Sequence, residues 1–198
     1  MTAAGSIEVF PATAERWADV QVLLGGDGER GCWCQYWRHS SSDYRALGPG
    51  GGRRALRRQL DDTPAPGVVA YLDGQPVGWC GFGPRAKMER LVRSRTIPRP
   101  DDMPVWSIVC FLVRPGFRRR GVAAALLAGA VAYARVSGAP AVEAYPVDPG
   151  GRRVDTAFGY VGFVPMFEKA GFRTVVKTAA YSDRRARILM RADLTERT

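Results

Sequence analysis

The sequence is short of cysteine, histidine and long apolar runs, and each shortage excludes a class of protein. Four cysteines in 198 residues are too few for a disulfide scaffold. Cys32 and Cys34 resemble one half of a zinc site, but the chain has no second cysteine pair and His39 is not spaced like a finger ligand, so we expect no metal. No apolar run reaches the roughly 18 residues of a membrane-spanning helix, and the first residues lack signal-peptide features. We therefore predict a soluble cytoplasmic protein with no membrane partner.

Lysine is also scarce. Only Lys87, Lys169 and Lys177 are present, so the net charge of +10 comes almost wholly from arginine. Such a surface attracts polyanions, which makes a basic nucleic-acid-binding module one hypothesis. Charge does not identify the polyanion, and a bias toward arginine, alanine and glycine is sometimes a habit of a whole proteome. From charge alone we do not expect a nucleic-acid partner.

Hydrophobic periodicity and turn residues divide the chain into short elements of one domain, residues 1–198, with a core over about 5–195. Strands are predicted at residues 7–10, in a hairpin over 67–83, at 105–113, at 141–147 and in a hairpin over 172–194, and helices at 13–24, 53–60, 121–136 and 165–170. Residues 85–104 hold three prolines and many charges, which predicts a long solvated connection. The order predicts an α/β fold: a mixed, mostly antiparallel central sheet with one central parallel strand-helix-strand crossover, flanked by helices.

The stretch FRRRGVAAALL, residues 117–127, follows an apolar strand and opens an alanine-rich helix. The first N–H groups of a helix lack partners within it, and the helix dipole adds about half a positive charge there, which favours an anion. Gly121 would let a phosphate approach the backbone, and the three arginines would add donors at the rim. A solvated charge run is the alternative interpretation. The glycine patterns of dinucleotide-binding folds and P-loops are both missing.

Residues 113–123, VRPGFRRRGVA, resemble motif A of the GCN5-related N-acetyltransferases, and Arg118, Gly121 and Ala123 fill its three defining positions. Residues 167–172, FEKAGF, resemble a second segment of that family. The resemblance covers roughly residues 5–195. It implies the family's fold and an enzyme that transfers the acetyl group of acetyl-coenzyme A to a primary amine by direct attack in a ternary complex.

The resemblance also implies a binding site for acetyl-coenzyme A. Backbone groups of Phe111, Leu112 and Val113 would pair with the pantetheine arm like an added strand. The pyrophosphate would be held by the turn and the helix start, at Arg118, Arg119, Arg120, Gly121, Val122, Ala123 and Ala124. Two positions depart from the family: its frequent general-acid tyrosine falls on Phe167, which has no proton to donate, and a frequent asparagine falls on Tyr160. We expect both residues to contact the coenzyme, although Tyr160 has packing as an alternative role.

Candidates for proton transfer come from the strand AVEAYPV, where Glu143 is the only carboxylate and shares a face with Tyr145. Burying an isolated carboxylate is costly unless it is paired or its pKa is raised, and both conditions suit a general base. We predict Glu143 as the base or a substrate contact, and Tyr145 as the hydroxyl that protonates the leaving thiolate. The alternative for Glu143 is an ion pair with one of the many arginines.

The aromatic segment CWCQYW, residues 32–37, falls where the first helices of the family shape the acceptor site. Trp33, Tyr36 and Trp37 would either wall an amine pocket through cation–π contacts or form a core cluster under a long loop. The acceptor, a small molecule or a peptide, is not readable from these residues. The last two strands often mediate pairing in relatives, which makes a homodimer a further hypothesis. Phe167 keeps one alternative function open, a domain that binds coenzyme A without catalysis.

Overall fold

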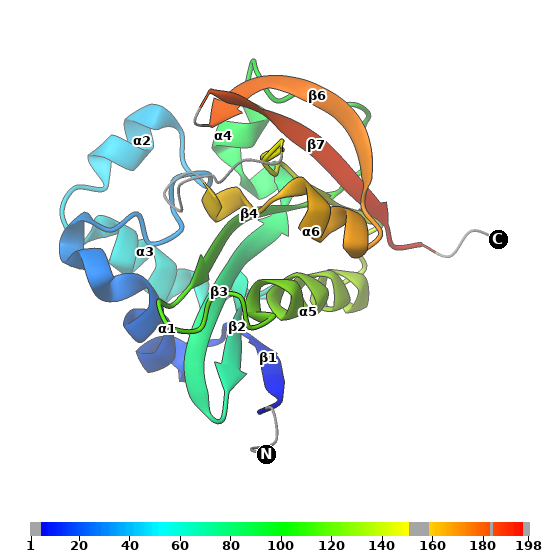
Figure 1. Ribbon diagram of the computed structural model, residues 1–198. Helices are drawn as coiled ribbons and strands as arrows, with labels where there is room; N and C mark the ends of the chain where they lie inside the picture. Colours follow the sequence, from blue (N-terminus) through cyan, green and yellow to red (C-terminus); the bar gives the residue numbers. More distant parts are fainter. Residues whose placement is uncertain (1–4, 151–158, 183, 196–198) are drawn as a thin grey trace.

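The fold is organised around one sheet with the strand order β1-β2-β3-β4-β5-β7-β6 (Figure 1). The computed structural model describes residues 5–150, 159–182 and 184–195. The strands are β1 (Ile7–Pro11), β2 (Gly67–Leu72), β3 (Gln75–Pro84), β4 (Trp106–Val113), β5 (Ala141–Ala144), β6 (Arg173–Ser182) and β7 (Arg185–Asp193). The α-helices are α1 (Trp17–Leu24), α2 (Ser41–Ala46), α3 (Gly51–Gln59), α4 (Glu89–Val92), α5 (Val122–Val136) and α6 (Val164–Lys169). Short 3-10 helices are η1 (Ala14–Arg16), η2 (Gly25–Arg30), η3 (Arg85–Lys87) and η4 (Gly159–Val161).

The centre of the sheet is the pair β4 and β5, which run parallel and are joined through α5. The other neighbouring pairs are antiparallel. β4 has the nearly all-apolar sequence WSIVCFLV. Both of its faces are covered by other parts of the protein, so apolar and polar residues do not alternate along it as they do in a strand with one face in water. The predicted fold class is therefore confirmed, including the parallel crossover.

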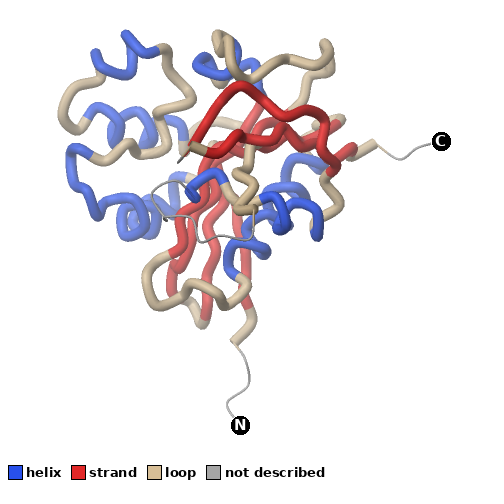
Figure 2. Tube along the Cα trace, turned by 45° about the horizontal axis from the view of Figure 1, so that its top comes forward, coloured by secondary structure: helices blue, strands red, loops and turns tan. Residues whose placement is uncertain are grey.

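Helices cover both faces of the sheet, as Figure 2 shows for the blue helices on either side of the red strands. α5 and α6 pack on one face over a core that includes Phe82, Leu126 and Phe167. On the other face α1 and α3 pack over a second core, which includes Leu56 and Trp79. Within the described ranges, no helix has both the length and the apolar character needed to cross a bilayer.

Small side chains bring α5 close to the sheet. A β-carbon on Gly129 would lie 2.4 Å from Cγ1 of Val9, and one on Gly78 would lie 2.8 Å from Cγ1 of Val122. Alanines fill much of the rest of the helix, so its axis lies near the strands. This close approach fixes where the first turn of α5 stands relative to the end of β4.

Two predictions about individual segments were wrong, and one helix was missed. β5 ends at Ala144 rather than at residue 147, because Pro146 has no N–H for a ladder and Val147 forms only isolated bridges. Residues 85–104 are not simply a solvated connection: they include η3 and α4, and Met88, Leu91 and Ile97 are buried. The helix α2 was not predicted, since its six residues SSDYRA carry no apolar stripe.

We expect Gly129→Val to lower the free energy of unfolding by about 1–3 kcal/mol, the usual cost of forcing extra atoms into a packed contact. Ala128→Val is the matched control, because Ala128 is the neighbouring position on the exposed side of α5. The control adds a β-branched residue to the helix and should cost about 0.5 kcal/mol. Chemical denaturation measures both changes. Equal losses would show that α5 does not need the close approach at Gly129.

Candidate active site

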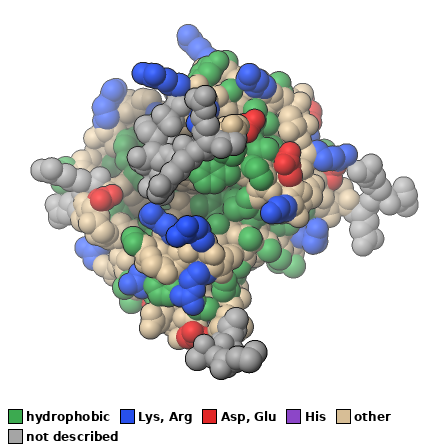
Figure 3. Space-filling view, viewed as in Figure 1, with side chains coloured by type: hydrophobic (Ala, Val, Ile, Leu, Met, Phe, Trp, Pro, Cys, Tyr) green, Lys and Arg blue, Asp and Glu red, His purple; other side chains and the backbone are tan. Residues whose placement is uncertain are grey.

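A cavity of about 1030 Å³ lies where β4 and β5 separate, beyond the pair Ile108–Ala144. Val109 is an extra residue in β4, because Cys110 pairs with Gly81 while Ile108 pairs with Phe82, and such a bulge bends a strand. Figure 3 shows apolar side chains gathered in a hollow of the surface, with Lys and Arg side chains at its margin. The divergence of two central strands therefore makes the cavity.

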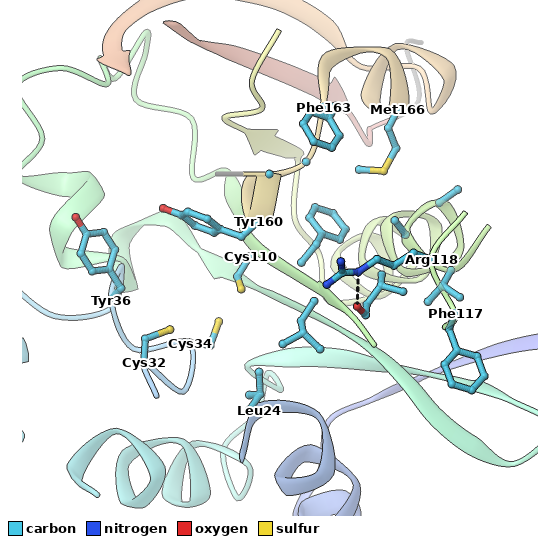
Figure 4. Close-up of a pocket in the computed structure, with 18 of the residues that line it drawn as sticks. Leu24, Cys32, Cys34, Tyr36, Cys110, Phe117, Arg118, Tyr160, Phe163 and Met166 are labelled. Atoms are coloured by element: carbon cyan, nitrogen blue, oxygen red, sulfur yellow. Dashed lines mark hydrogen bonds between the residues drawn. The ribbon is translucent and has the colours of Figure 1, made fainter. Parts of the chain in front are cut away.

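One wall of the cavity is the free edge of β4, formed by Cys110, Phe111, Leu112 and Val113. β3 pairs with these residues on one side, and in the described ranges no strand pairs with them on the other. Their unpaired N–H and C=O groups are available to an extended ligand that adds like a strand. One of them is already engaged, because Nε of Arg118 donates to the Val113 carbonyl at 3.3 Å (Figure 4).

A second wall is the start of α5, where residues 122–124 line the cavity. Gly121 precedes them with φ +84°, a left-handed conformation that favours glycine. The N–H of Ala125 donates to the Gly121 carbonyl at 3.0 Å, and the N–H groups before it come too early for an acceptor within the helix. No acidic side chain lies in this turn, while Arg118 and Arg119 also line the cavity. Free helix N–H groups and two arginines without an acidic neighbour are the features that favour an anion, here at the end of β4.

The third wall is aromatic. Trp33, Tyr36 and Trp37 all line the cavity, as expected, although their burial differs. Trp33 and Trp37 belong to the core, and Nε1 of Trp33 donates to the Gly28 carbonyl at 3.0 Å. Tyr36 is 41% exposed and carries the Arg90 guanidinium 4.0 Å from its ring centroid. Membership of the core is therefore observed for Trp33 and Trp37, and all three rings also face the cavity.

Three cysteines also line the cavity, and two of them lie near each other, Cys34 in the loop before α2 and Cys110 in β4 (Figure 4). A hydrogen bond from Cys110 lowers the pKa of the Cys34 thiol, and the nearby charge of Arg38 lowers it further, against the effect of burial. The pairing with Cys34 and then burial raise the pKa of Cys110. Within the described ranges, no three or more His, Cys, Asp or Glu side chains are arranged to hold a metal ion.

Glu143 and Tyr145 lie outside the cavity lining, in a buried ion-pair network behind it. The Glu143 carboxylate is fully buried and accepts from Arg85 at 2.8 Å and from Arg191 at 2.7 Å. The Tyr145 hydroxyl lies 3.2 Å from the same carboxylate and 2.9 Å from Oγ of Ser107. Burial, then the charge of Glu143, raises the pKa of Tyr145 well above its ordinary value. The structure thus places Glu143 in the ion pair that was the alternative to a base.

Three further candidates occupy different places. Tyr160 lines the cavity, and its hydroxyl accepts from Nη2 of Arg187 at 3.0 Å. Phe167 is fully buried beside the cavity, with its ring centroid 6.0 Å from that of Phe111. Arg120 does not line the cavity.

Several lining residues were not predicted from the sequence. They are mostly apolar or cysteine side chains, namely Leu24, Asp27, Gly31, Cys32, Cys34, Cys110, Phe117, Gly159, Gly162, Phe163 and Met166. Phe163 and Met166 lie close to FEKAGF and belong to the start of the same helix, so the second family-like segment carried a signal for them. Cys32, Cys34 and Phe117 also lie in segments that the sequence singled out, CWCQYW and FRRRGVAAALL. The remaining residues had no such signal, because the sequence does not show whether a side chain faces a core or a cavity.

Known proteins that are similar to this chain are acetyltransferases. A model described as the acetyltransferase (GNAT) family matches residues 33–172. No curated protein matches the chain. Among solved structures, the histone acetyltransferase HPA2 and related acetyltransferase from Corynebacterium glutamicum is 18% identical, with 98% of this chain and 99% of that chain covered and a TM-score of 0.56.

Two more solved structures share the fold at similar distance. A GCN5-related N-acetyltransferase from Kribbella flavida is 18% identical, with 95% of this chain and 98% of that chain covered and a TM-score of 0.55. A chain of the NatC complex bound to Gag peptide and CoA is 14% identical, with coverage of 96% and 99% and a TM-score of 0.55. At these identities the likeness concerns the fold alone.

We expect Glu143→Gln to destabilise the protein by about 3–5 kcal/mol, because two guanidinium groups then face a neutral amide inside the protein. Asp193→Asn is the matched control: it also removes a carboxylate from an arginine pair, but the Asp193 side chain is 37% exposed. An exposed pair contributes less than about 1 kcal/mol, so the control should unfold almost like the parent protein. Urea denaturation at neutral pH measures both. A small loss for Glu143→Gln would mean that the buried network is not structural.

Proposed function

Because the chain belongs to the acetyltransferase (GNAT) family, we propose that it transfers the acetyl group of acetyl-coenzyme A to a primary amine by direct attack in a ternary complex. One observation carries the proposal: a single cavity joins the free edge of β4, the open N-terminus of α5 and an aromatic end. The first two suit an extended amide chain that ends in a pyrophosphate. The third leaves room for a second molecule beside the thioester.

The fit to acetyl-coenzyme A is argued from backbone groups. Phe111, Leu112 and Val113 offer unpaired strand-edge groups to the pantetheine arm, which itself carries amides. The N–H groups at 122–124 and the side chains of Arg118 and Arg119 would hold the pyrophosphate. To open the whole edge, Arg118 has to leave the Val113 carbonyl. Its side chain is exposed, so this rearrangement costs little.

Proton transfer is proposed to use water and hydroxyl groups of the cavity. Glu143 and Tyr145 are held in the buried network away from the cavity, so we assign them to structure rather than to catalysis. The attacking amine would lose its proton to water. The leaving thiolate would regain one from water or from another hydroxyl group of the cavity, since Phe167 has none to give.

Gly121→Val should weaken acetyl-coenzyme A binding more than Arg119→Ala does. A β-branched residue at φ +84° is strained and forces the turn at the anion site to move, whereas Arg119→Ala removes one exposed side chain. We expect a Kd about ten-fold higher or more for Gly121→Val, measured by isothermal titration calorimetry. Gly116→Val is the matched control, because Gly116 has φ +86° in the same connection but does not line the cavity. The reverse ranking would favour a basic patch over a backbone cradle.

A panel of primary amines, assayed for release of free coenzyme A thiol and for the acetylated product by mass spectrometry, tests the transfer itself. We expect at least one amine to give equal amounts of thiol and acetylated product. Saturating acetyl-coenzyme A should also raise Tm by mass action. A Tm shift without any transfer across the panel would favour the alternative of coenzyme binding without catalysis. If acetyl-coenzyme A causes no Tm shift and no amine is acetylated, both catalysis and coenzyme binding without catalysis are contradicted.

A further inference from the structure

One buried charge has no counter-ion among the residues that the structure describes. Among the described residues three charged side chains are buried: Arg85, Glu143 and Arg187. Arg85 and Glu143 neutralise each other. Arg187, in β7, is 6% exposed, and none of the carboxylates in the described ranges forms a salt bridge with it. Burying a guanidinium without a counter-ion is costly, so its presence calls for a partner.

The contacts of Arg187 leave hydrogen-bond donors unused. Its Nε and Nη2 donate to Oγ of Ser182 at 3.1 and 2.9 Å, and Nη2 also donates to the Tyr160 hydroxyl at 3.0 Å. Nη1 is buried and has no acceptor. The guanidinium carbon lies 5.2 Å from the ring centroid of Trp37, whose Nε1 is also buried without an acceptor. Two buried N–H groups without an acceptor, on Nη1 of Arg187 and Nε1 of Trp37, therefore lie beside a positive charge that has no counter-ion among the described residues.

This cluster stands directly behind the aromatic end of the cavity. Tyr160 and Trp37 both line the cavity, and Arg187 lies against the rings of both. Figure 4 shows the Tyr160 hydroxyl directed toward Tyr36, away from Arg118 and the anion site at α5. Because this hydroxyl accepts from Arg187, its own proton is free to be donated into the cavity. A ligand in the cavity would therefore contact the Tyr160 hydroxyl, which is itself polarised by the positive charge of Arg187 behind it.

We propose that the aromatic end of the cavity recognises a carboxylate carried by the amine acceptor. A carboxylate oxygen accepts from the Tyr160 hydroxyl, and the carboxylate supplies the counter-ion that Arg187, behind this hydroxyl, lacks among the described residues. Tyr36 and Trp37 flank the carbon skeleton. The acceptor class is then an amino acid or another amine with a carboxylate, and cations without an anionic group are disfavoured. This assignment rests on the proposed acetyl transfer.

Matched pairs of acceptors test the assignment. L-phenylalanine is compared with L-phenylalaninamide, and glycine with glycinamide, as substrates of the parent protein, Arg187→Met, Arg187→Lys and Tyr160→Phe. The amides are less basic and hold more free amine, so a preference for the acids cannot come from amine protonation. In the parent protein we expect kcat/KM for at least one of the two acids to exceed that for its own amide by about ten- to thirty-fold, mainly because KM is lower. The preference should fall to within about two-fold in Arg187→Met and persist in part in Arg187→Lys.

Product binding separates this proposal from the transfer reaction. Calorimetry with coenzyme A present compares N-acetyl-L-phenylalanine with N-acetyl-L-phenylalaninamide, which requires no turnover. Tighter binding of the acid by the parent protein, lost in Arg187→Met and weakened in Tyr160→Phe, supports the carboxylate site even if no amine is acetylated. Equal binding of acid and amide overturns the site even if other amines are acetylated.

Folding and internal charge are controlled separately. Arg173→Met removes an arginine from the exposed edge of the same hairpin and should leave every preference unchanged. Each variant must keep the rise in Tm with acetyl-coenzyme A, which shows that it is folded and binds the coenzyme. If Arg187→Met does not fold, Tyr160→Phe, which loses only one oxygen, replaces it as the test of the carboxylate site. Asp155 and Asp183 lie outside the described residues. If Asp155→Asn or Asp183→Asn abolishes the acid preference as Arg187→Met does, the counter-ion is internal and the proposal is overturned.

Discussion

The site depends on the parallel pairing of β4 and β5, which stops after three residue pairs. The bulge at Val109 bends β4, and Pro146 ends the ladder of β5, so the two strands diverge inside a sheet that is otherwise continuous. A strand edge is normally found at the rim of a sheet, where water satisfies its polar groups. Here an edge lies in the interior, next to a helix N-terminus. The proposed binding of the coenzyme therefore relies on this geometry rather than on any one reactive side chain.

The buried carboxylate of Glu143 maintains the divergence. It joins β5 to Arg191 of β7 and to Arg85 of η3, and Arg191 also pairs with Asp101. Four segments are therefore held at the closed end of the two strands, while their other ends are free to separate. A well-packed apolar cluster of the same volume is often as stable as a buried ion pair, but it lacks the directional bonds that fix strand position.

The fold could be predicted from the sequence, and the residues proposed for anion binding could be located in it, because both depend on local patterns. The apolar strand at 105–113, the turn at Gly121 and the alanine-rich helix are contiguous, and their order predicted the crossover. Roles that depend on distant partners were out of reach. An ion pair was one alternative for Glu143, but its partners could not be named because Arg85 and Arg191 are far away in the chain. Nothing in the sequence distinguished Arg187 from the other arginines. Burial of a charge is a tertiary property, so no spacing rule reveals it.

The position of β7 has a consequence for synthesis of the protein. It is the last strand in the chain, yet it lies between β5 and β6 rather than at the edge of the sheet. Until residues 185–193 have left the ribosome, β5 has one unpaired side and Glu143 lacks Arg191. The pairing of β5 is therefore completed only after residues 185–193 have been synthesised, and a growing chain exposes the flank of β5 to other proteins until then. Chaperone binding during synthesis is best sought at this flank.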